Sequence, residues 1–467
     1  MLAIQPPAKR VLGPVRVFAL SFGCIVGSGW VVVLGDWLKA CGPAGVVLGM
    51  LAGGSVMLAN SGAYAELIAR YPMVGGEFVF AQKVFGDRTA FLVGWLWTLS
   101  LIAVAVFEAT ALPWLLETLL PGMKGPTLYV LLDTPVTADA LGVALVGTIF
   151  VAIMNYRGAH TAATLQTILS FVFLSLAVLI VSLGFALGSF RNLEPLVRGD
   201  HARRWWLGSL WIFAIAPFFL NGFQSVAQTV EERTENVTFP RVAASMALAL
   251  LVGIGFYCLV TLAAASAEPW QTLLDRPMAT AAAFAHLLPH HMLSVLVLAA
   301  AALSVARLWN GVTIWAARLL MAQARAGFLP AWLGAAHEHH GSPTTAVIFV
   351  AICTAAGALL GRGAIIPLVD MASLCLAGNL VLACIAALRV RVTQGAESLP
   401  YCTPGGMGTL IYALIGSAGM TSFMIVDPIL RRPGSIPIEW IVTGVWVSMG
   451  IVFWRIWRPV TIAISRP

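Results

Sequence analysis

Two ionisable side chains lie deep inside apolar segments of this 467-residue sequence. Glu108 stands in the second half of the apolar stretch 90–115, and Arg307 stands in the middle of the stretch 291–320. A charge inside a membrane-spanning segment is costly, so such a side chain faces the protein interior and pairs, titrates or contacts carbonyl groups or water. We therefore interpret Glu108 as a group that recognises an ammonium group or carries a proton. For both residues a purely structural ion pair is the alternative, with Asp370 as a second possible partner of Arg307.

Two apolar stretches contain residues that interrupt helices. Gly27-Ser28-Gly29 lies in the stretch 15–38, and the stretch 207–230 holds Pro217, Asn221 and Gly222. A helix that is broken at membrane depth exposes backbone groups that lipid cannot satisfy, so such a break is tolerated only where it is buried in protein or lines a cavity. Paired breaks indicate a solute-binding site, whereas glycine-mediated helix packing and a simple proline kink are the alternatives.

The composition places these features in a membrane protein. Hydrophobic residues make up 60% of the chain and charged residues 10%, with a mean hydropathy of +0.90. We predict an all-α polytopic fold, because this composition leaves too little polar surface for a soluble globule. Apolar stretches of about 20 residues predict twelve spans, at 15–38, 43–68, 90–115, 138–156, 162–187, 207–230, 241–266, 291–320, 344–360, 364–389, 406–426 and 438–457.

The net charge of +7 would suggest a nucleic-acid partner in a soluble protein, but in a membrane protein the distribution of basic residues matters more. With the N-terminus inside, sixteen of the 27 Lys and Arg residues fall inside and ten outside, although the loop Arg191–Arg204 argues the other way. We expect an integral protein of the bacterial cytoplasmic membrane with both termini cytoplasmic and no nucleic-acid partner. We expect the tail 1–14, the linker 390–405 and the tail 458–467 to be among its cytoplasmic segments.

No metal, cofactor or enzymatic chemistry is expected. The seven cysteines show no CxxC spacing and most lie in predicted spans, so we interpret them as small apolar residues. The loop histidines 286, 290, 291, 337, 339 and 340 lack convincing metal spacing. No nucleophile and base pair and no phosphate-binding loop for ATP is present, which argues against an enzyme.

Several longer motifs resemble a known superfamily. The break in the first span is followed by AELIARYPMVGGEFVFAQKVFG, and later by NYRGAHTAATLQTIL, FFLNGFQSVAQTVEERTENVTFPR and AARLLMAQARAGFLPAWL. In this order they resemble the amino acid, polyamine and organocation transporter superfamily over about the first 390 residues. Spans 11 and 12, in the region 406–457, match only as hydrophobic helices.

The resemblance implies an inverted-repeat core over 15–389, with repeats 15–187 and 207–389, spans 1 and 6 unwound halfway, and two C-terminal helices. It implies a secondary transporter (permease) for an amino acid or small organic amine that works by alternating access in the lipid bilayer. A membrane amine sensor or a channel on the same scaffold is the alternative. The implied substrate-binding residues are Ile25, Gly27, Ser28, Gly29, Trp30, Glu108, Phe218, Asn221, Gly222 and Gln224. Trp30 and Phe218 could instead simply fill the core.

The resemblance also suggests how transport is coupled. Sodium-driven relatives hold a sodium ion between the unwound part of span 1 and span 8, and aligning back from Arg318 places Arg307 next to that position. Some proton-driven relatives fill the position with a lysine from span 5, but the corresponding residues Ser170–Phe173 offer none. We predict that Arg307 supplies the missing positive charge. Because a guanidinium does not release its proton, coupling would fall to Glu108 or be absent, and transport would be sodium-independent, proton-coupled or exchange.

Three further expectations concern carboxylates near the ends of spans. Glu66 and Arg70 lie four residues apart on one helical face and are expected to pair. Asp36 and Asp370 are expected to be solvated or capping carboxylates near the outer side, with attraction of an incoming cation as the alternative. The second span, rich in Gly, Ala and Ser, is expected to pack closely against its neighbours.

Overall fold

The computed structural model describes residues 13–73, 75–120, 122–123, 125–156, 159–198, 204–228, 230, 233–234, 237–337, 342–395, 400–431 and 436–457. For residues 159–165 and 431 it describes the backbone alone. The predicted tail 458–467, most of the predicted tail 1–14 and the centre of the predicted linker 390–405 lie outside the described residues.

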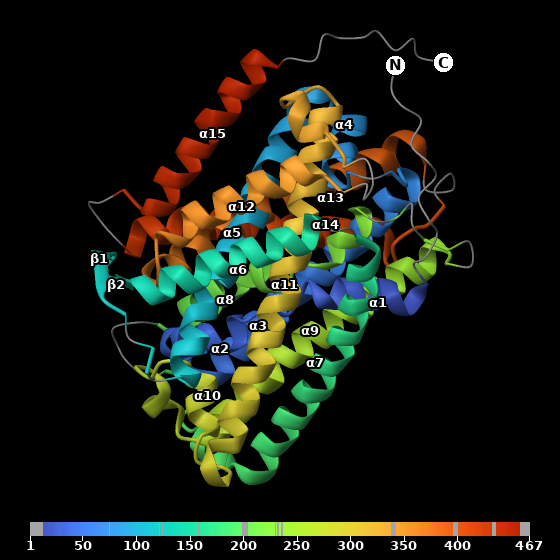
Figure 1. The fold of residues 1–467 in the computed structure, drawn as a ribbon. Coiled ribbons are helices and arrows are strands. Elements are labelled where there is room, and N and C mark those ends of the chain that lie inside the picture. The colour runs from blue at the N-terminus through green and yellow to red at the C-terminus, as the bar shows by residue number, and fades with distance from the viewer. Residues whose placement is uncertain are drawn as a thin grey trace.

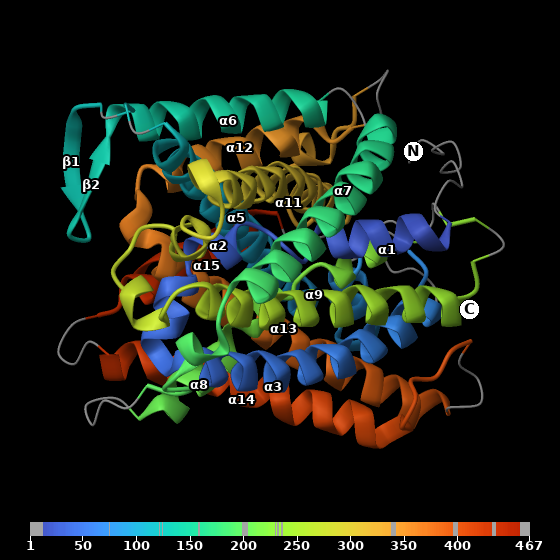
Figure 2. The same ribbon diagram turned by 90° about the horizontal axis from the view of Figure 1, so that it is seen from below.

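The first half of the chain is helical apart from one hairpin. Its helices are α1 (Pro14–Gly23), α2 (Gly29–Val32), α3 (Leu34–Arg70), α4 (Glu77–Phe85), α5 (Asp87–Leu119), α6 (Ala138–Tyr156) and α7 (Ala159–Leu187). The antiparallel strands β1 (Thr127–Leu131) and β2 (Thr134–Thr137) lie between α5 and α6. This hairpin projects from one end of the bundle beside the start of α6 (Figures 1 and 2).

The second half is helical in the same way. Its helices are α8 (Trp205–Phe219), the 3-10 helix η2 (Phe223–Gln228), α9 (Phe239–Ala267), α10 (Ala279–Phe284), α11 (Met292–Arg325), α12 (Thr344–Ala358), α13 (Ile365–Gln394), α14 (Gly406–Arg431) and α15 (Ile438–Ile456). In Figure 2, α3, α6, α9 and α14 run in roughly the same direction and α7 crosses them at a tilt, while Figure 1 shows α15 at the edge of the molecule.

Ten helical segments of the described chain are long and apolar enough to cross a membrane, which indicates an integral membrane protein. The helices α1 and α12 are apolar but shorter, with 10 and 15 residues. Most predicted spans agree with observed helices within a few residues. The exception is the beginning of the chain, where the predicted spans 15–38 and 43–68 are divided among α1, α2 and α3. The predicted turn between them is a kink inside α3, where Gly42 has a φ of +74° and precedes Pro43.

Glycines on α3 set its distance to α8. A Cβ atom on Gly49 would lie 2.5 Å from the carbonyl oxygen of Ser209, and one on Gly53 would overlap Ala216. Only residues without a side chain permit this approach, which is how closely packed membrane helices are generally built. The expectation of close packing for this segment is confirmed.

The segment between α7 and α8 is bonded to several distant parts of the chain, and we call residues 192–198 the strap. Ala44 N donates a hydrogen bond to Leu196 O at 2.9 Å, so the strap runs against the kink of α3. Three more bonds run from Arg198 N to Cys41 O, from Trp270 Nε1 to Pro195 O and from Asn192 Nδ2 to Ser266 O, at 3.3, 2.9 and 2.8 Å. The strap therefore joins the kink to the end of α9 and the residues after it.

Glu66 pairs with Arg391 of α13, so the predicted pair with Arg70 is wrong. Arg391 Nε donates to Glu66 Oε2 at 2.8 Å and its Nη2 donates to Oε1, while Thr403 N donates to Oε1 at 2.6 Å. Arg70 Nε instead donates to Gln394 at 2.6 Å. Spacing along one helix shows only that two side chains share a face, whereas the approach of Arg391 depends on how two distant helices pack.

The Glu66–Arg391 pair predicts a measurable loss of stability when it is broken. Both side chains are buried, so Arg391→Ala leaves a buried carboxylate unpaired, at a cost of about 3–5 kcal/mol. We expect a clearly lower thermal unfolding midpoint for the purified protein in detergent. Arg70→Ala, which removes a neighbouring arginine whose partner is an uncharged amide, is the matched control. Equal midpoints for the two variants would contradict a stabilising role of the pair.

Candidate functional site

The helix of the first span is interrupted between α1 and α2. Residues Cys24–Ser28 are not helical; α1 ends at Gly23 and α2 begins at Gly29. The structure thus has a break at the predicted place, with the Gly27-Ser28-Gly29 motif at its C-terminal border. We call residues 24–28 the first break.

The second break consists of residues 220–222, between α8 and η2. Pro217 lies inside α8, so the helix continues past the proline and ends at Phe219. The two breaks touch each other. A Cβ atom on Gly222 would lie 2.6 Å from the carbonyl carbon of Cys24 and 2.7 Å from the nitrogen of Ile25. Glycine at this position therefore allows one broken segment to lie directly against the other.

Glu108 of α5 binds the first break from its N–H side. Ser28 N donates to Glu108 Oε1 at 3.1 Å, and Ser28 Oγ donates to Oε2 at 2.7 Å. The carboxylate is 1% exposed. A Cβ atom on Gly27 would collide with this carboxylate, so the motif needs glycine here for the carboxylate to reach Ser28. Both carboxylate oxygens accept bonds from the same residue, so Glu108 contacts the break through Ser28.

Arg307 of α11 binds the same break from its carbonyl side. Its Nη2 donates to Val26 O at 2.7 Å, and its Cζ lies 5.3 Å and 4.6 Å from the ring centroids of Phe22 and Phe173. The side chain is fully buried, and its Nε and Nη1 have no hydrogen-bond partner within the described part of the chain. A guanidinium between aromatic faces gains cation–π attraction where it has lost water. Phe173 belongs to the Ser170–Phe173 stretch that lacks a lysine.

The alternative interpretation of Arg307 as half of an ion pair finds no support among the described residues. Neither Glu108 nor Asp370 lies within ion-pairing distance of its guanidinium. Asp370 is 3% exposed and accepts a hydrogen bond from Trp211 Nε1 at 3.0 Å, so the prediction of a solvated or capping carboxylate is wrong for it. Asp36 is exposed in the first turn of α3.

Polar side chains surround the second break. Gly222 N donates to Gln224 Oε1 at 3.0 Å, and Ser225 Oγ donates to Gly222 O at 2.6 Å. Two polar atoms here, Asn221 Oδ1 and Gln224 Nε2, are buried without a hydrogen-bond partner in the described chain. Buried polar atoms normally have partners, so these two are candidates for binding a solute. Tyr257 of α9, which the sequence analysis missed, donates to Ile25 O at 3.4 Å.

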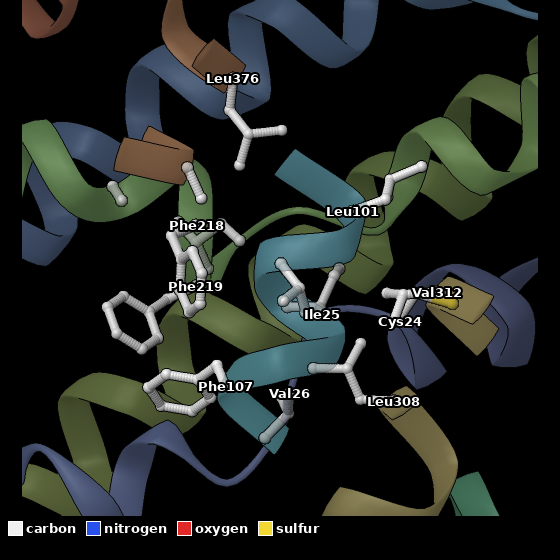
Figure 3. Packing of buried hydrophobic residues seen from close by; sticks show 14 of the residues in the cluster. Cys24, Ile25, Val26, Leu101, Phe107, Phe218, Phe219, Leu308, Val312 and Leu376 are labelled. Atoms are coloured by element: carbon white, nitrogen blue, oxygen red, sulfur yellow. The ribbon is translucent and has the colours of Figure 1, made fainter. Parts of the chain in front are cut away.

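Apolar side chains from four helices gather around Ile25 of the first break. Figure 3 shows Leu101 and Phe107 of α5, Phe218 and Phe219 of α8, Leu308 and Val312 of α11 and Leu376 of α13. The ring of Phe218 lies edge-on to those of Phe107 and Phe219, with centroids 5.2 Å and 5.0 Å away. Phe107 and Phe219 were also missed, because in an apolar sequence nothing distinguishes such residues from other core residues.

Trp30 is the predicted site residue whose side chain lies apart from the others. Its ring packs edge-on against Phe173 of α7 and Phe256 of α9, at centroid distances of 6.3 Å and 5.4 Å. The other predicted residues lie at the two breaks or, like Glu108 and Phe218, against them. No three His, Cys, Asp or Glu side chains of the described chain gather as a metal site.

Known proteins match this chain over most of its length. It is 25% identical over 365 residues to an uncharacterized transporter of Rhizobium meliloti, covering 76% of this chain and 74% of that protein. It is 24% identical to the branched-chain amino acid permease BcaP of Lactococcus lactis, covering 96% and 94%. It is 28% identical to the mouse cationic amino acid transporter 4, covering 60% and 44%. The profile of the amino acid permease family matches residues 12–454, and the chain therefore belongs to this family of membrane transporters.

Proposed function

We propose that the protein is a secondary transporter that carries an amino acid by alternating access around the two breaks. The observation that supports this most is the contact between the breaks, beside which polar atoms of Asn221 and Gln224 have no hydrogen-bond partner among the described residues. Interrupted helices that meet in the middle of a membrane protein are the usual place for a substrate and a coupling ion. Membership of the amino acid permease family supports an amino acid as the solute. The proposal includes an inverted repeat, in which residues 15–187 and residues 207–389 are the two related halves.

The surroundings of the breaks favour an amino acid with an apolar side chain. The backbone of residues 27–29 offers N–H groups for the substrate carboxylate once Glu108 releases Ser28 N, and Asn221 Oδ1 offers an acceptor for its ammonium group. Leu101, Phe107 and Phe218 would then surround the substrate side chain. Among the described residues, no carboxylate other than Glu108 lies at the breaks, and Ser28 already engages both of its oxygens. A cationic side chain would find no free carboxylate in this described part of the chain.

Coupling in this proposal rests on the two buried charges. Arg307 holds a fixed positive charge at the carbonyl side of the first break, where it takes the place of a bound cation, so sodium is not required. Glu108 carries the proton, since protonation converts one of its two acceptor oxygens into a donor. That oxygen would no longer accept its bond from Ser28, which would loosen the N–H side of the break. Proton binding at Glu108 and substrate binding at residues 27–29 are thus linked through Ser28.

Uptake into liposomes tests the function itself. We expect the reconstituted protein to accumulate labelled leucine in preference to labelled lysine, and unlabelled leucine inside the vesicles to accelerate entry, as alternating access requires. A sensor would give binding without uptake. A channel would give uptake without acceleration by internal substrate, so either result would refute the proposed mechanism. A preference for lysine would be compatible with a transporter but would refute the proposal that the substrate has an apolar side chain.

The Glu108→Gln variant tests whether Glu108 carries the coupled proton. The variant keeps the shape of the side chain but lacks a charged acceptor for Ser28, and bonds to charged groups are worth about 1.5–3 kcal/mol. We expect leucine uptake driven by a pH gradient to fall roughly ten- to a hundredfold, with an unchanged elution profile of the purified protein. Glu268→Gln, which alters a carboxylate paired with Arg276, is the control. Wild-type uptake with an unchanged pH profile would remove Glu108 from the mechanism.

Replacing sodium in the transport buffer tests whether Arg307 takes the place of a coupling cation. Uptake by the wild type is expected to be the same in sodium, potassium and choline buffers, and to be lost in Arg307→Ala. Arg307→Lys keeps the charge but not the planar stacking on Phe22 and Phe173, so we expect partial activity. Arg276→Ala serves as the control for removing an arginine. A strong sodium requirement in the wild type would contradict the role of Arg307 as a substitute for the cation.

A further inference from the structure

A buried carboxylate lies where the first half of the chain meets the second. Glu77 is the first residue of α4 and is 3% exposed. Gln228 is the last residue of η2, is 2% exposed, and its Nε2 donates to Glu77 Oε2 at 3.4 Å. Both residues belong to the motifs that resemble known transporters, AELIARYPMVGGEFVFAQKVFG and FFLNGFQSVAQTVEERTENVTFPR. The proposed function leaves this pair of side chains without a role.

Two glycines bring the start of α4 against η2. Gly75 and Gly76 have φ values of +119° and +48°, a backbone conformation that residues with a side chain rarely adopt. A Cβ atom on Gly76 would lie 2.7 Å from Gln228 Nε2 and 3.2 Å from the Cβ of Ala227. Glycine at this turn therefore permits the close approach that buries the carboxylate.

Tyr64 of α3 joins the same two elements. Its ring packs edge-on against Phe80 of α4 and Phe223 of η2, at centroid distances of 6.2 Å and 5.3 Å. Its hydroxyl lies beside the Glu77 carboxylate but outside hydrogen-bond geometry. We call Tyr64, Glu77 and Gln228 the Glu77 contact. It connects α3 and α4 to η2, the segment that directly follows the second break.

Three oxygen atoms of the Glu77 contact are buried without a hydrogen-bond partner among the described residues. They are Glu77 Oε1, Gln228 Oε1 and Tyr64 Oη. Buried polar atoms normally have partners, and a buried ionised carboxylate is far more costly than a neutral carboxyl group. A protonated carboxyl group also has an O–H that can donate to a neighbouring oxygen. A proton on Glu77 would therefore remove a buried charge and supply a donor at the same time.

The charged and titratable side chains on the elements around Glu77 are engaged elsewhere or exposed. On α11, Arg318 Nη1 donates to the backbone carbonyl of Gln228 at 3.5 Å. On α13, Arg391 pairs with Glu66, and the Cys384 thiol donates to Asn60 Oδ1 at 3.1 Å. The exposed ones on α4, α5 and α13 are Lys83, Asp87, Arg88 and Arg389. Among the described side chains, no cation within 4.0 Å stabilises an ionised Glu77.

Burial raises the pKa of Glu77 to about 8. The bond from Gln228 and the nearby Tyr64 hydroxyl lower this pKa, but by less than burial raises it. Glu77 lies between the spanning segments Leu34–Arg70 and Asp87–Leu119. It is therefore close to one aqueous side of the membrane, from which a proton can come.

We propose that Glu77 is a second proton-binding residue of the transporter, protonated while the Glu77 contact is closed and ionised when the contact opens. This inference rests on the proposed function, in which one side of the protein closes as the other opens. A neutral carboxyl group can stay buried between α4 and η2, whereas an ionised one requires water. Water reaches Glu77 when η2 separates from α4, and the proton leaves to that water. The pH on this side then sets how readily the contact opens.

Thermal unfolding of the purified full-length protein in detergent tests the bound proton without measuring transport. The folded protein keeps a proton that the unfolded chain releases, so the stability contributed by Glu77 is lost as the pH rises from about 4.5 to about 8. Between about pH 5.5 and about pH 7.5 we expect the midpoint to fall by roughly 2 °C more in the wild type than in Glu77→Gln. Glu77→Asp should keep the pH dependence. Glu268→Gln, which alters a carboxylate paired with Arg276, should match the wild type.

Hydrogen exchange measured by mass spectrometry tests whether the proton controls the contact. At about pH 8.5 the wild-type carboxylate is largely ionised, whereas Glu77→Gln copies its neutral form. The backbone amides of residues 77–85 and 223–228 should therefore exchange roughly tenfold more slowly in the variant. Both proteins are measured at the same pH, so the intrinsic exchange rates are equal. Glu268→Gln should exchange like the wild type.

Several outcomes would overturn this proposal. Equal pH dependence of the two midpoints, or equal exchange in the two proteins, would mean that Glu77 holds no proton that matters to the contact. A Glu77→Gln protein that fails to fold would also contradict it, because glutamine copies the protonated form. A midpoint that differs among sodium, potassium and choline buffers in the wild type but not in Glu77→Gln would show that the three oxygens hold a metal cation instead. Absence of leucine uptake by the wild type would refute the proposed function but would not alter these measurements.

Discussion

A lipid bilayer cannot hydrogen-bond to peptide groups, and every interrupted helix in this protein must satisfy that constraint from within. The first break leaves both N–H and carbonyl groups outside a helix. Glu108 binds the N–H side through Ser28, and Arg307 binds the carbonyl side through Val26. At the second break, Gln224 and Ser225 bond to the backbone of Gly222. Buried polar side chains thus occupy positions that water would take in a soluble protein.

Glu108 and Arg307 bind different parts of the first break, which explains why these two buried side chains do not form an ion pair with each other. Each charge has the sign that its part of the backbone requires, negative at the amide hydrogens and positive at the carbonyl oxygen. The peptide segment between Val26 and Ser28 lies between them. A change in either charge therefore acts on the conformation of that segment, which is a physical basis for linking ionisation to the shape of the break.

Local sequence patterns predicted most helices, both breaks and the burial of Glu108 and Arg307, because hydrophobicity and glycine or proline content act on neighbouring residues. They did not predict contacts between distant segments. The partner of Glu66 proved to be Arg391, Asp370 proved to be buried against Trp211, and Phe173 proved to stack on Arg307. In a chain that is 60% hydrophobic, almost any apolar residue could fill such a position, so identifying the one that does requires the fold.

The strap has a consequence for how this chain can vary in length. Its four backbone and side-chain bonds connect residues 192, 195, 196 and 198 to the kink of α3 on one side and to the end of α9 and the residues after it on the other. An inserted or deleted residue within 192–198 would shift the register of several bonds at once. The hairpin tip between β1 and β2 carries fewer hydrogen bonds in the described chain, although Leu132 and Thr134 lie close to Gly363. A change in length is therefore expected to disturb more hydrogen bonds in the strap than at the hairpin tip.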